Sequence, residues 1–170
     1  MTWRQPVVLL LFVGVAAVWL WQAPTEQTLR FPMPTNKAYV QECGSCHTAF
    51  APGTLPARSW RLMMANLSDH FGEDASMEEP YEFAILKELE TFASDGNHAD
   101  MRMQRISASI SSNAAPQEFS KLPYFLKLHD ELAPNVWQRK KVGVASNCIA
   151  CHSRANEGRY DELEVRIPAG

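Results

Sequence analysis

The chain has 170 residues, 46% of them hydrophobic and 21% charged, and its formal net charge is −3 at pH 7. This mildly acidic balance argues against a nucleic-acid-binding protein, which needs a basic surface. About 135 residues follow the amino-terminal apolar segment and the linker after it, which predicts one exported domain by length.

The amino terminus predicts export and a membrane segment. Arg4 precedes an apolar run, and the 19 residues from Trp3 to Trp21 are just enough to span a bilayer. Trp3, Trp19 and Trp21 flank the run like an interfacial aromatic belt. The residues that follow it make a poor cleavage site for a signal peptidase. We therefore favour a retained transmembrane helix over residues 1–22, with a cleaved signal as the alternative.

A linker and a short helix are expected next. Residues 23–36 are polar and contain Pro24, Pro32 and Pro34, so they cannot be helical throughout. They would hold the following domain away from the membrane. A short helix from Lys37 to Cys46 is predicted to carry the first of two cysteine motifs.

All four cysteines lie in two short motifs, Cys43-Gly44-Ser45-Cys46-His47 and Cys148-Ile149-Ala150-Cys151-His152. Both read C-x-x-C-H, the attachment site of c-type haem. Two thiols at this spacing can each form a thioether to a vinyl group of one porphyrin, and the adjacent histidine supplies the proximal nitrogen to the iron. The sequence therefore predicts two covalently bound c-type haems, with His47 and His152 as proximal ligands.

Other uses of four cysteines explain less. One zinc ion could bind two C-x-x-C pairs, but Cys46 and Cys148 are too far apart for a zinc ribbon. A thioredoxin-like C-x-x-C needs a strand before it, and no strand-rich run precedes either motif. Disulfides suit an exported protein, but they leave the two histidines at the same offset unexplained.

Helices joined by long loops are expected after the first motif. Residues 51–56 are predicted to form a loop, because prolines and a glycine interrupt them. A helix is predicted from Ser59 to the glycine stop at Gly72. Its apolar positions recur every three or four residues and are Trp60, Met63, Met64, Leu67 and Phe71.

A second helix is predicted from Ser76, where Glu79 completes a capping box and Pro80 falls in the first turn. Its apolar face is Tyr81, Ile85, Leu89 and Phe92, and it ends at residues 94–97. Residues 101–116 are ambiguous. Residues 119–132 and 136–141 are predicted to be short helical pieces broken by Pro123 and Pro134. No run alternates like an ordinary strand, so the fold class is mainly α.

Three more histidines are candidates for the distal position on the two irons, since histidine and methionine are the usual axial ligands of electron-transfer haems. His70 falls on the apolar face of its predicted helix, and His129 follows the apolar stretch 124–128. Both are therefore expected to be ligands. His98 lies in a polar turn, residues 95–100, and is expected at the surface.

The spacing favours local pairing of these ligands. His70 follows His47 by 23 residues, and His129 precedes His152 by 23 residues. Crossed pairing is the alternative. Methionine ligation is another, and the candidates are Met63, Met64, Met101 and Met103, although methionines at helical spacing more often fill a core.

Two longer strings resemble the bacterial dihaem cytochrome c family, over roughly residues 39–168. The first joins Cys43–His47 to Pro52–Trp60 and Leu67–Gly72, and the second joins His129–Leu132 to Asn147–His152 and Val165–Pro168. The resemblance implies electron donation to an oxygen-binding monohaem cytochrome and related partners.

The same resemblance implies the organisation of the chain. A class I cytochrome c-like helical domain is expected over residues 37–100, and a loop-rich segment wrapping the second haem over residues 101–170. Bis-histidine ligation carries over onto His70 and His129, and Trp60 lies in the matching string. Arg58, beside the first haem loop, is the candidate partner of a haem propionate.

These expectations describe an electron carrier. Two histidines on one iron leave no open position, which suits electron transfer and not catalysis. A carrier that is anchored in the membrane, with its haems in the periplasm, would serve redox proteins or a membrane complex. The alternatives are an accessory subunit of such a complex, a soluble periplasmic carrier after signal cleavage, and a dihaem peroxidase or reductase.

Residues 139–141 form the densest basic cluster, expected on a solvated face.

Overall fold

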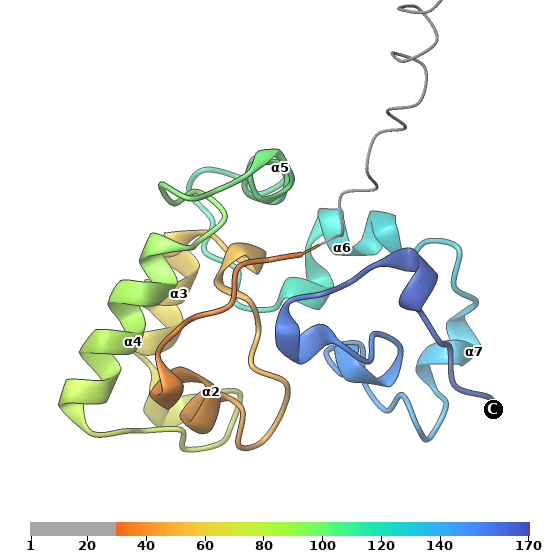
Figure 1. Ribbon diagram of the computed structural model, residues 1–170, viewed down its shortest axis with the longest axis horizontal. Helices are drawn as coiled ribbons and strands as arrows, with labels where there is room; N and C mark the ends of the chain where they lie inside the picture. The colour runs from red at the N-terminus through yellow and green to blue at the C-terminus, as the bar shows by residue number, and fades with distance from the viewer. Residues whose placement is uncertain (1–29) are drawn as a thin grey trace, which may run out of the picture.

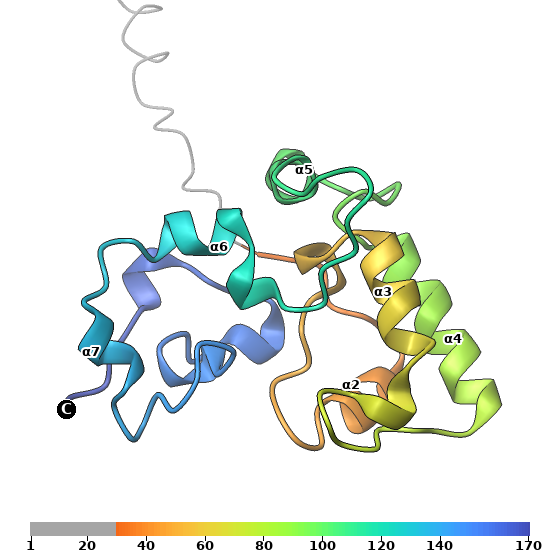
Figure 2. The same cartoon turned by 180° about the vertical axis from the view of Figure 1, so that it is seen from behind.

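The computed structural model describes residues 30–170, and most of its helices fall into two groups (Figures 1 and 2). The first group holds α2 (Lys37–Cys43), α3 (Ala57–Met64) and α4 (Glu79–Thr91), and α3 and α4 lie side by side in both views. The second group holds α6 (Pro123–Leu128) and α7 (Pro134–Trp137), with the carboxyl-terminal segment beside them. Helix α5 (Met101–Ala108) is drawn above the two groups in both views, and its buried residues Met103 and Ile106 join the core of the first group.

Short 3₁₀ turns connect these helices. They are Pro52–Thr54, Leu67–Asp69, Phe119–Lys121, Cys148–Ala150, Ala155–Glu157 and Glu162–Glu164. Residues 30–170 contain no β-strand, only the isolated bridges Arg30–Arg159 and His70–Glu73. The predicted mainly α class is confirmed.

The predicted transmembrane helix over residues 1–22 lies outside the described residues, as does most of the linker 23–36. Within residues 30–170, no helix combines the length and the apolar character needed to cross a bilayer.

Helix α3 is shorter than the sequence predicts. The apolar spacing continues to Phe71, but the helix ends at Met64 and a separate 3₁₀ turn follows. Leu67 lies in that turn, and its side chain is buried. The apolar residues therefore keep their helical spacing beyond the end of the helix. His70 lies in a turn and not on a helix face.

Prolines begin helices here and do not break them. Pro80, Pro123 and Pro134 each occupy the first or second position of a helix, where the missing N–H has no intrahelical partner to lose. The N-cap position of α4 is Glu78 and not the predicted Ser76, and no side chain makes a capping hydrogen bond there. Residues 101–116, ambiguous in sequence, contribute α5.

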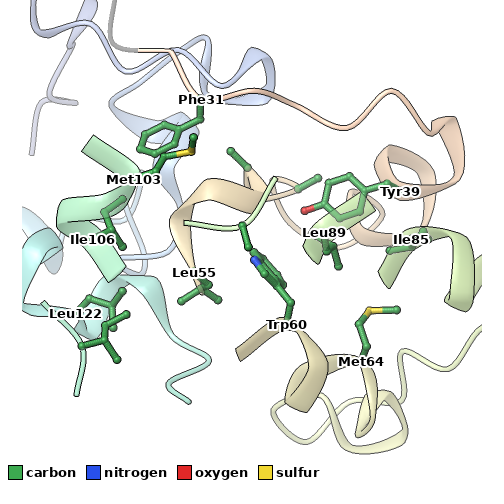
Figure 3. Close-up of a cluster of buried hydrophobic side chains, with 14 of the residues drawn as sticks. Phe31, Tyr39, Leu55, Trp60, Met64, Ile85, Leu89, Met103, Ile106 and Leu122 are labelled. Atoms are coloured by element: carbon green, nitrogen blue, oxygen red, sulfur yellow. The ribbon is translucent and has the colours of Figure 1, made fainter. Parts of the chain in front are cut away.

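The buried core joins α2, α3, α4 and α5 (Figure 3). The Trp60 indole Nε1–H donates to the Pro52 carbonyl at 2.8 Å, which fixes α3 against the preceding 3₁₀ turn. Tyr39 is 2% exposed, and its hydroxyl donates to the Phe50 carbonyl. Phe31 and Met103 lie together at the other end of the same cluster.

This cluster crosses the domain boundary expected at residue 100. Met103 and Ile106 come from the range 101–170, yet they pack in one cluster with Trp60 of the range 37–100. The division into 37–100 and 101–170 stays a prediction.

A carboxylate ties the entry of the described chain to α4. Glu88 accepts hydrogen bonds from the Thr35 backbone N–H at 2.6 Å, the Thr35 hydroxyl at 3.0 Å and the Asn36 backbone N–H at 3.1 Å. Asn36 in turn caps α2 by accepting from the Ala38 N–H at 2.9 Å. Helix α2, which carries Cys43, is thereby held in place on α4.

Truncating the core face of α4 is expected to destabilise the fold. Leu89 is 1% exposed, so Leu89→Ala should lower the free energy of unfolding by about 2–5 kcal/mol, since it leaves a cavity. Denaturation of the haem-loaded protein, followed by circular dichroism, measures this loss. Phe83→Ala, on the same helix at 73% exposure, is the matched control, and equal losses in the two variants would contradict the assigned core.

Candidate metal centres

The first centre forms where α2 meets the loop before α4. Helix α2 ends at Cys43, and Gly44 caps it. A Cβ on Gly44 would lie 2.1 Å from the Val40 carbonyl oxygen, so the close turn that presents the motif requires glycine at this position. The ring centroids of His47 and His70 lie 6.2 Å apart, with 24° between the ring planes.

A tight turn presents His70 to His47. The His70 N–H donates to the Glu73 carbonyl at 2.8 Å, and the Glu73 N–H donates to the His70 carbonyl at 3.2 Å. Between them Phe71 has φ 57° and Gly72 has φ 93°. Phe71 is the only non-glycine residue with positive φ within residues 30–170, which marks this turn as a constrained one. The Phe71 ring stands edge-on to the His70 ring at 4.8 Å.

The second centre is built from α6 and the carboxyl-terminal segment. His129 caps the end of α6. The 3₁₀ turn Cys148–Ala150 carries the second motif, and the His152 N–H donates back to the Cys148 carbonyl at 2.8 Å. The ring centroids of His129 and His152 lie 6.3 Å apart, with 82° between their planes.

A largely apolar cleft surrounds this second pair. Both histidines line it together with Cys148 and Cys151. Leu128 and Ile167 also line it and remain 57% and 47% exposed. Large apolar side chains open to solvent around a cleft fit a flat apolar ligand that would cover them.

Hydrogen bonds fix the tautomer of one histidine in each pair. Nδ1 of His47 lies 2.8 Å from the Thr48 carbonyl oxygen, and Nδ1 of His129 lies 2.9 Å from the Phe125 carbonyl oxygen. A carbonyl can only accept, so Nδ1 carries the proton in both rings. The lone pair of Nε2 is then free for a metal, as in most histidine ligands.

The separation of the rings fits an iron between them. An imidazole nitrogen bonds a transition metal at about 2 Å and lies about 1.1 Å from the ring centroid, so two opposed ligands have centroids about 6.2 Å apart. The observed separations are 6.2 and 6.3 Å. With a C-x-x-C pair beside one histidine of each couple, both centres fit a covalently attached haem.

The fold therefore brings together the two histidine pairs that local pairing predicts. His47 lies with His70, and His129 lies with His152. Assignment of these four residues as iron ligands stays a prediction.

The electrostatics of both centres favour neutral groups. Burial, and secondly the positive charge of His47, lower the pKa of His70, while burial and then His129 lower the pKa of His152. Burial raises the pKa of the Cys43 and Cys148 thiols to about 11. Neutral imidazole is the form that binds a metal, and a thioether carries no charge.

Two predicted cofactor contacts have other partners in the structure. Arg58 donates from Nε to the Ala114 carbonyl at 2.5 Å and from Nη2 to the Ser111 carbonyl at 3.2 Å, and its Nη1 lies 3.5 Å from Asp95. It therefore ties α3 to two loops, and pairing with a propionate stays a prediction. Trp60 is 4% exposed in the core, and its indole N–H is already bound.

The remaining candidates have other surroundings. His98 stacks on Phe92 at 5.0 Å. Met64 and Met103 are buried in the hydrophobic core, and Met101 is 73% exposed. Of the basic cluster 139–141, Arg139 donates to the Pro168 carbonyl at 2.6 Å.

The alternative uses of the cysteines find no support. All four cysteines are free, with no disulfide between them. Across residues 30–170, no group of three or more histidine, cysteine, aspartate or glutamate side chains is placed to hold a metal ion alone. The structure thus does not show one zinc ion shared by the two cysteine pairs.

The aromatic residues around the second pair were not predicted. Phe125 and Trp137 contact His129, and Tyr160 stands 5.3 Å from His152. Phe125 precedes His129 by four residues, so helical spacing could have indicated it. Trp137 is the last residue of α7 and Tyr160 lies in the carboxyl-terminal segment, and no local signal in the sequence predicts their contacts.

Comparison with known proteins gives a consistent result. Residues 39–160 match the family described as Dihaem cytochrome c. The solved structure of a diheme cytochrome c from Rhodobacter sphaeroides is 37% identical, and the match covers 75% of this chain and 98% of that one, with a TM-score of 0.67. A diheme cytochrome type c from Shewanella baltica OS155 is 35% identical, covering 81% and 96%, with a TM-score of 0.64. No curated protein matches the chain.

Proposed function

This chain belongs to the dihaem cytochrome c family, and from that premise we propose that it carries electrons between redox proteins through two bis-histidine haems. The two covalently bound c-type haems supply the one-electron chemistry. Cys43 and Cys46 would hold the first, and Cys148 and Cys151 the second.

The histidine geometry is the observation that carries this proposal. Both pairs have the ring separation that a single iron between them requires, 6.2 and 6.3 Å. His47 with His70, and His129 with His152, would then fill both axial positions of their irons. A filled coordination sphere leaves no place for oxygen or substrate, and two histidines imply lower potentials than a histidine with a methionine.

The chain holds these ligands rigidly, as electron transfer favours. His47 and His129 are each fixed by a hydrogen bond to a backbone carbonyl, and His70 lies in a doubly hydrogen-bonded turn. A peroxidase or reductase would need His70 or His129 to leave its iron. The family suggests an electron carrier and not an enzyme.

Ligand binding to the native protein tests this function. Because both irons would be six-coordinate, we expect low-spin spectra in the oxidised and reduced states and no reaction with carbon monoxide. Rapid mixing of the oxidised protein with a reduced partner cytochrome should show reduction of both haems without any substrate. Ready binding of carbon monoxide by native protein would instead support the enzyme alternative.

The location of the carrier is a second part of the proposal. Covalent haem attachment happens outside the cytoplasmic membrane, so we place the haem-bearing residues in the periplasm. If residues 1–22 are retained, Arg4 on the cytoplasmic side sets the orientation. Phe31 is buried in the core and its N–H donates to the Gly158 carbonyl, so only residues 23–29 would be left to extend, which gives a reach of roughly 20 Å from the bilayer at about 3 Å per residue. Its partner would be a redox protein or a membrane complex within that reach.

The mass of the mature protein tests the anchor. We expect the full chain with two haems in the membrane fraction, released only by detergent. Intact mass and amino-terminal sequencing measure this directly, and mild-detergent purification shows whether a complex co-migrates. A mature chain beginning near Pro24 in the soluble periplasmic fraction would contradict the anchor and leave electron transfer unaffected.

A further inference from the structure

The two histidine pairs differ in the orientation of their rings. Their separations are almost equal, but the planes of His47 and His70 make an angle of 24°, whereas those of His129 and His152 make an angle of 82°. The first pair is thus near parallel and the second near perpendicular. An iron held in each pair would therefore have the same two imidazole ligands but a different angle between their planes.

Two aromatic side chains, one of them buried, fix the ring of His129. Its Nδ1–H donates to the Phe125 carbonyl, and its ring stacks on the Phe125 ring with centroids 4.0 Å apart and 22° between planes. Trp137 lies 5.9 Å from His129 and 6.1 Å from Phe125. Phe125 is 5% exposed. A flat ring held against a buried flat ring cannot rotate without disturbing the packing.

Different local structure fixes the first pair. Nδ1–H of His47 donates to the Thr48 carbonyl, and the turn from His70 to Glu73 sets the backbone of His70. The ring of Phe71 meets that of His70 at 75°, edge-on and not stacked. The orientations at the two centres are therefore set independently.

Ring orientation has an electronic consequence for a low-spin iron. An imidazole donates π electrons perpendicular to its own plane. Two parallel rings act on the same iron d orbital and separate its energy from that of its neighbour, whereas perpendicular rings act on both and leave the two nearly equal. Parallel ligands therefore give a rhombic paramagnetic resonance spectrum, and perpendicular ligands a highly anisotropic one. Outer groups that orient a ligand tune its metal in this way.

We propose that Phe125, supported by Trp137, is a positioning residue that holds His129 across His152 and so makes the two haems electronically inequivalent. This inference rests on the proposed function, because it takes the four histidines as ligands. Phe125 acts through His129 and needs no contact with the iron.

Electron paramagnetic resonance of the oxidised, haem-loaded protein tests the proposal. We expect two low-spin signals of equal integrated intensity, one rhombic and one highly anisotropic. Phe125→Leu should shift the largest g value of the anisotropic signal toward the rhombic position and leave the other signal unchanged. Trp137→Leu should shift the same signal in the same direction, and it decides the matter if Phe125→Leu does not fold.

A matched control is available elsewhere in the fold. Phe92 also stacks on a histidine, His98, with centroids 5.0 Å apart and 30° between planes. That histidine belongs to neither pair, so Phe92→Leu should move neither signal. His129→Ala should abolish the anisotropic signal and His70→Ala the rhombic one, which assigns each signal to its centre.

The outcomes separate this inference from the function beneath it. Two identical rhombic low-spin signals in the native protein would overturn the inference and leave bis-histidine ligation intact. An anisotropic signal unmoved in every folded variant at Phe125 and Trp137 would overturn their positioning role. A high-spin or methionine-ligated second haem in the native protein would contradict the proposed function itself.

Discussion

Alanine in place of His129 is expected to open the second haem to carbon monoxide. The thioethers at Cys148 and Cys151 and the proximal His152 remain in this variant, so the haem should stay attached while its distal position becomes vacant. Native protein should bind almost no carbon monoxide, and His129→Ala should bind roughly one per chain. Optical titration of the reduced protein measures the stoichiometry, and part of the oxidised spectrum should become high-spin.

The same change at the first centre is expected to act on the other haem alone. His70→Ala should also bind roughly one carbon monoxide per chain, and the double variant roughly two. His98→Ala is the control, since His98 stacks on Phe92 outside both pairs. If His129→Ala stays low-spin and inert, another side chain is the ligand. If the double variant binds no more than a single one, the two-centre assignment is wrong.

Removing one pair of attachment cysteines is expected to halve the haem content. Cys43→Ala with Cys46→Ala leaves no thioether at the first centre, whereas the second motif and its cleft are unchanged. The pyridine haemochrome assay should then give about one covalent haem per chain in place of two. Intact mass should fall by one haem, and the anisotropic resonance signal of the second centre should survive.

The reciprocal variant, Cys148→Ala with Cys151→Ala, serves as the matched comparison. It should also keep one haem, and it should be the less stable of the two, because the second cleft leaves Leu128 and Ile167 exposed to solvent. The variant without any motif cysteine should fail to fold, because a chain of this size with so many loops needs the haems to complete its cores. One haem per native chain, or haem removed by acid acetone, would contradict the stoichiometry.

Local patterns in the sequence were reliable where chemistry sets the spacing. The two C-x-x-C-H motifs predicted two covalent haems, and the family confirms this cofactor. Pro80 and the apolar spacing predicted α4, and Ile85 and Leu89 are buried as expected, whereas Tyr81, predicted on the same face, is 49% exposed. In each case the pattern is satisfied by neighbours along the chain, so no tertiary information is needed.

Predictions of helix bounds failed where buried residues continue beyond the end of a helix and where prolines begin a helix. The apolar spacing from Trp60 to Phe71 predicted one helix, but the chain leaves the helix after Met64 and turns sharply at Phe71 and Gly72. Leu67 lies in a 3₁₀ turn and is still buried, so its helical spacing in the sequence indicated burial but not helix. Pro123 and Pro134 were expected to break helices and instead begin them.

By itself, the sequence determined the covalent chemistry of this protein, its two haems and its mainly helical class, because attachment motifs and apolar periods are local properties of the chain. Only the tertiary structure decided which histidines meet, since His47 and His70, or His129 and His152, approach through turns whose geometry depends on the whole fold. It also decided the angle within each pair, because contacts such as Phe125 and Trp137 on His129 arise from packing between separate segments.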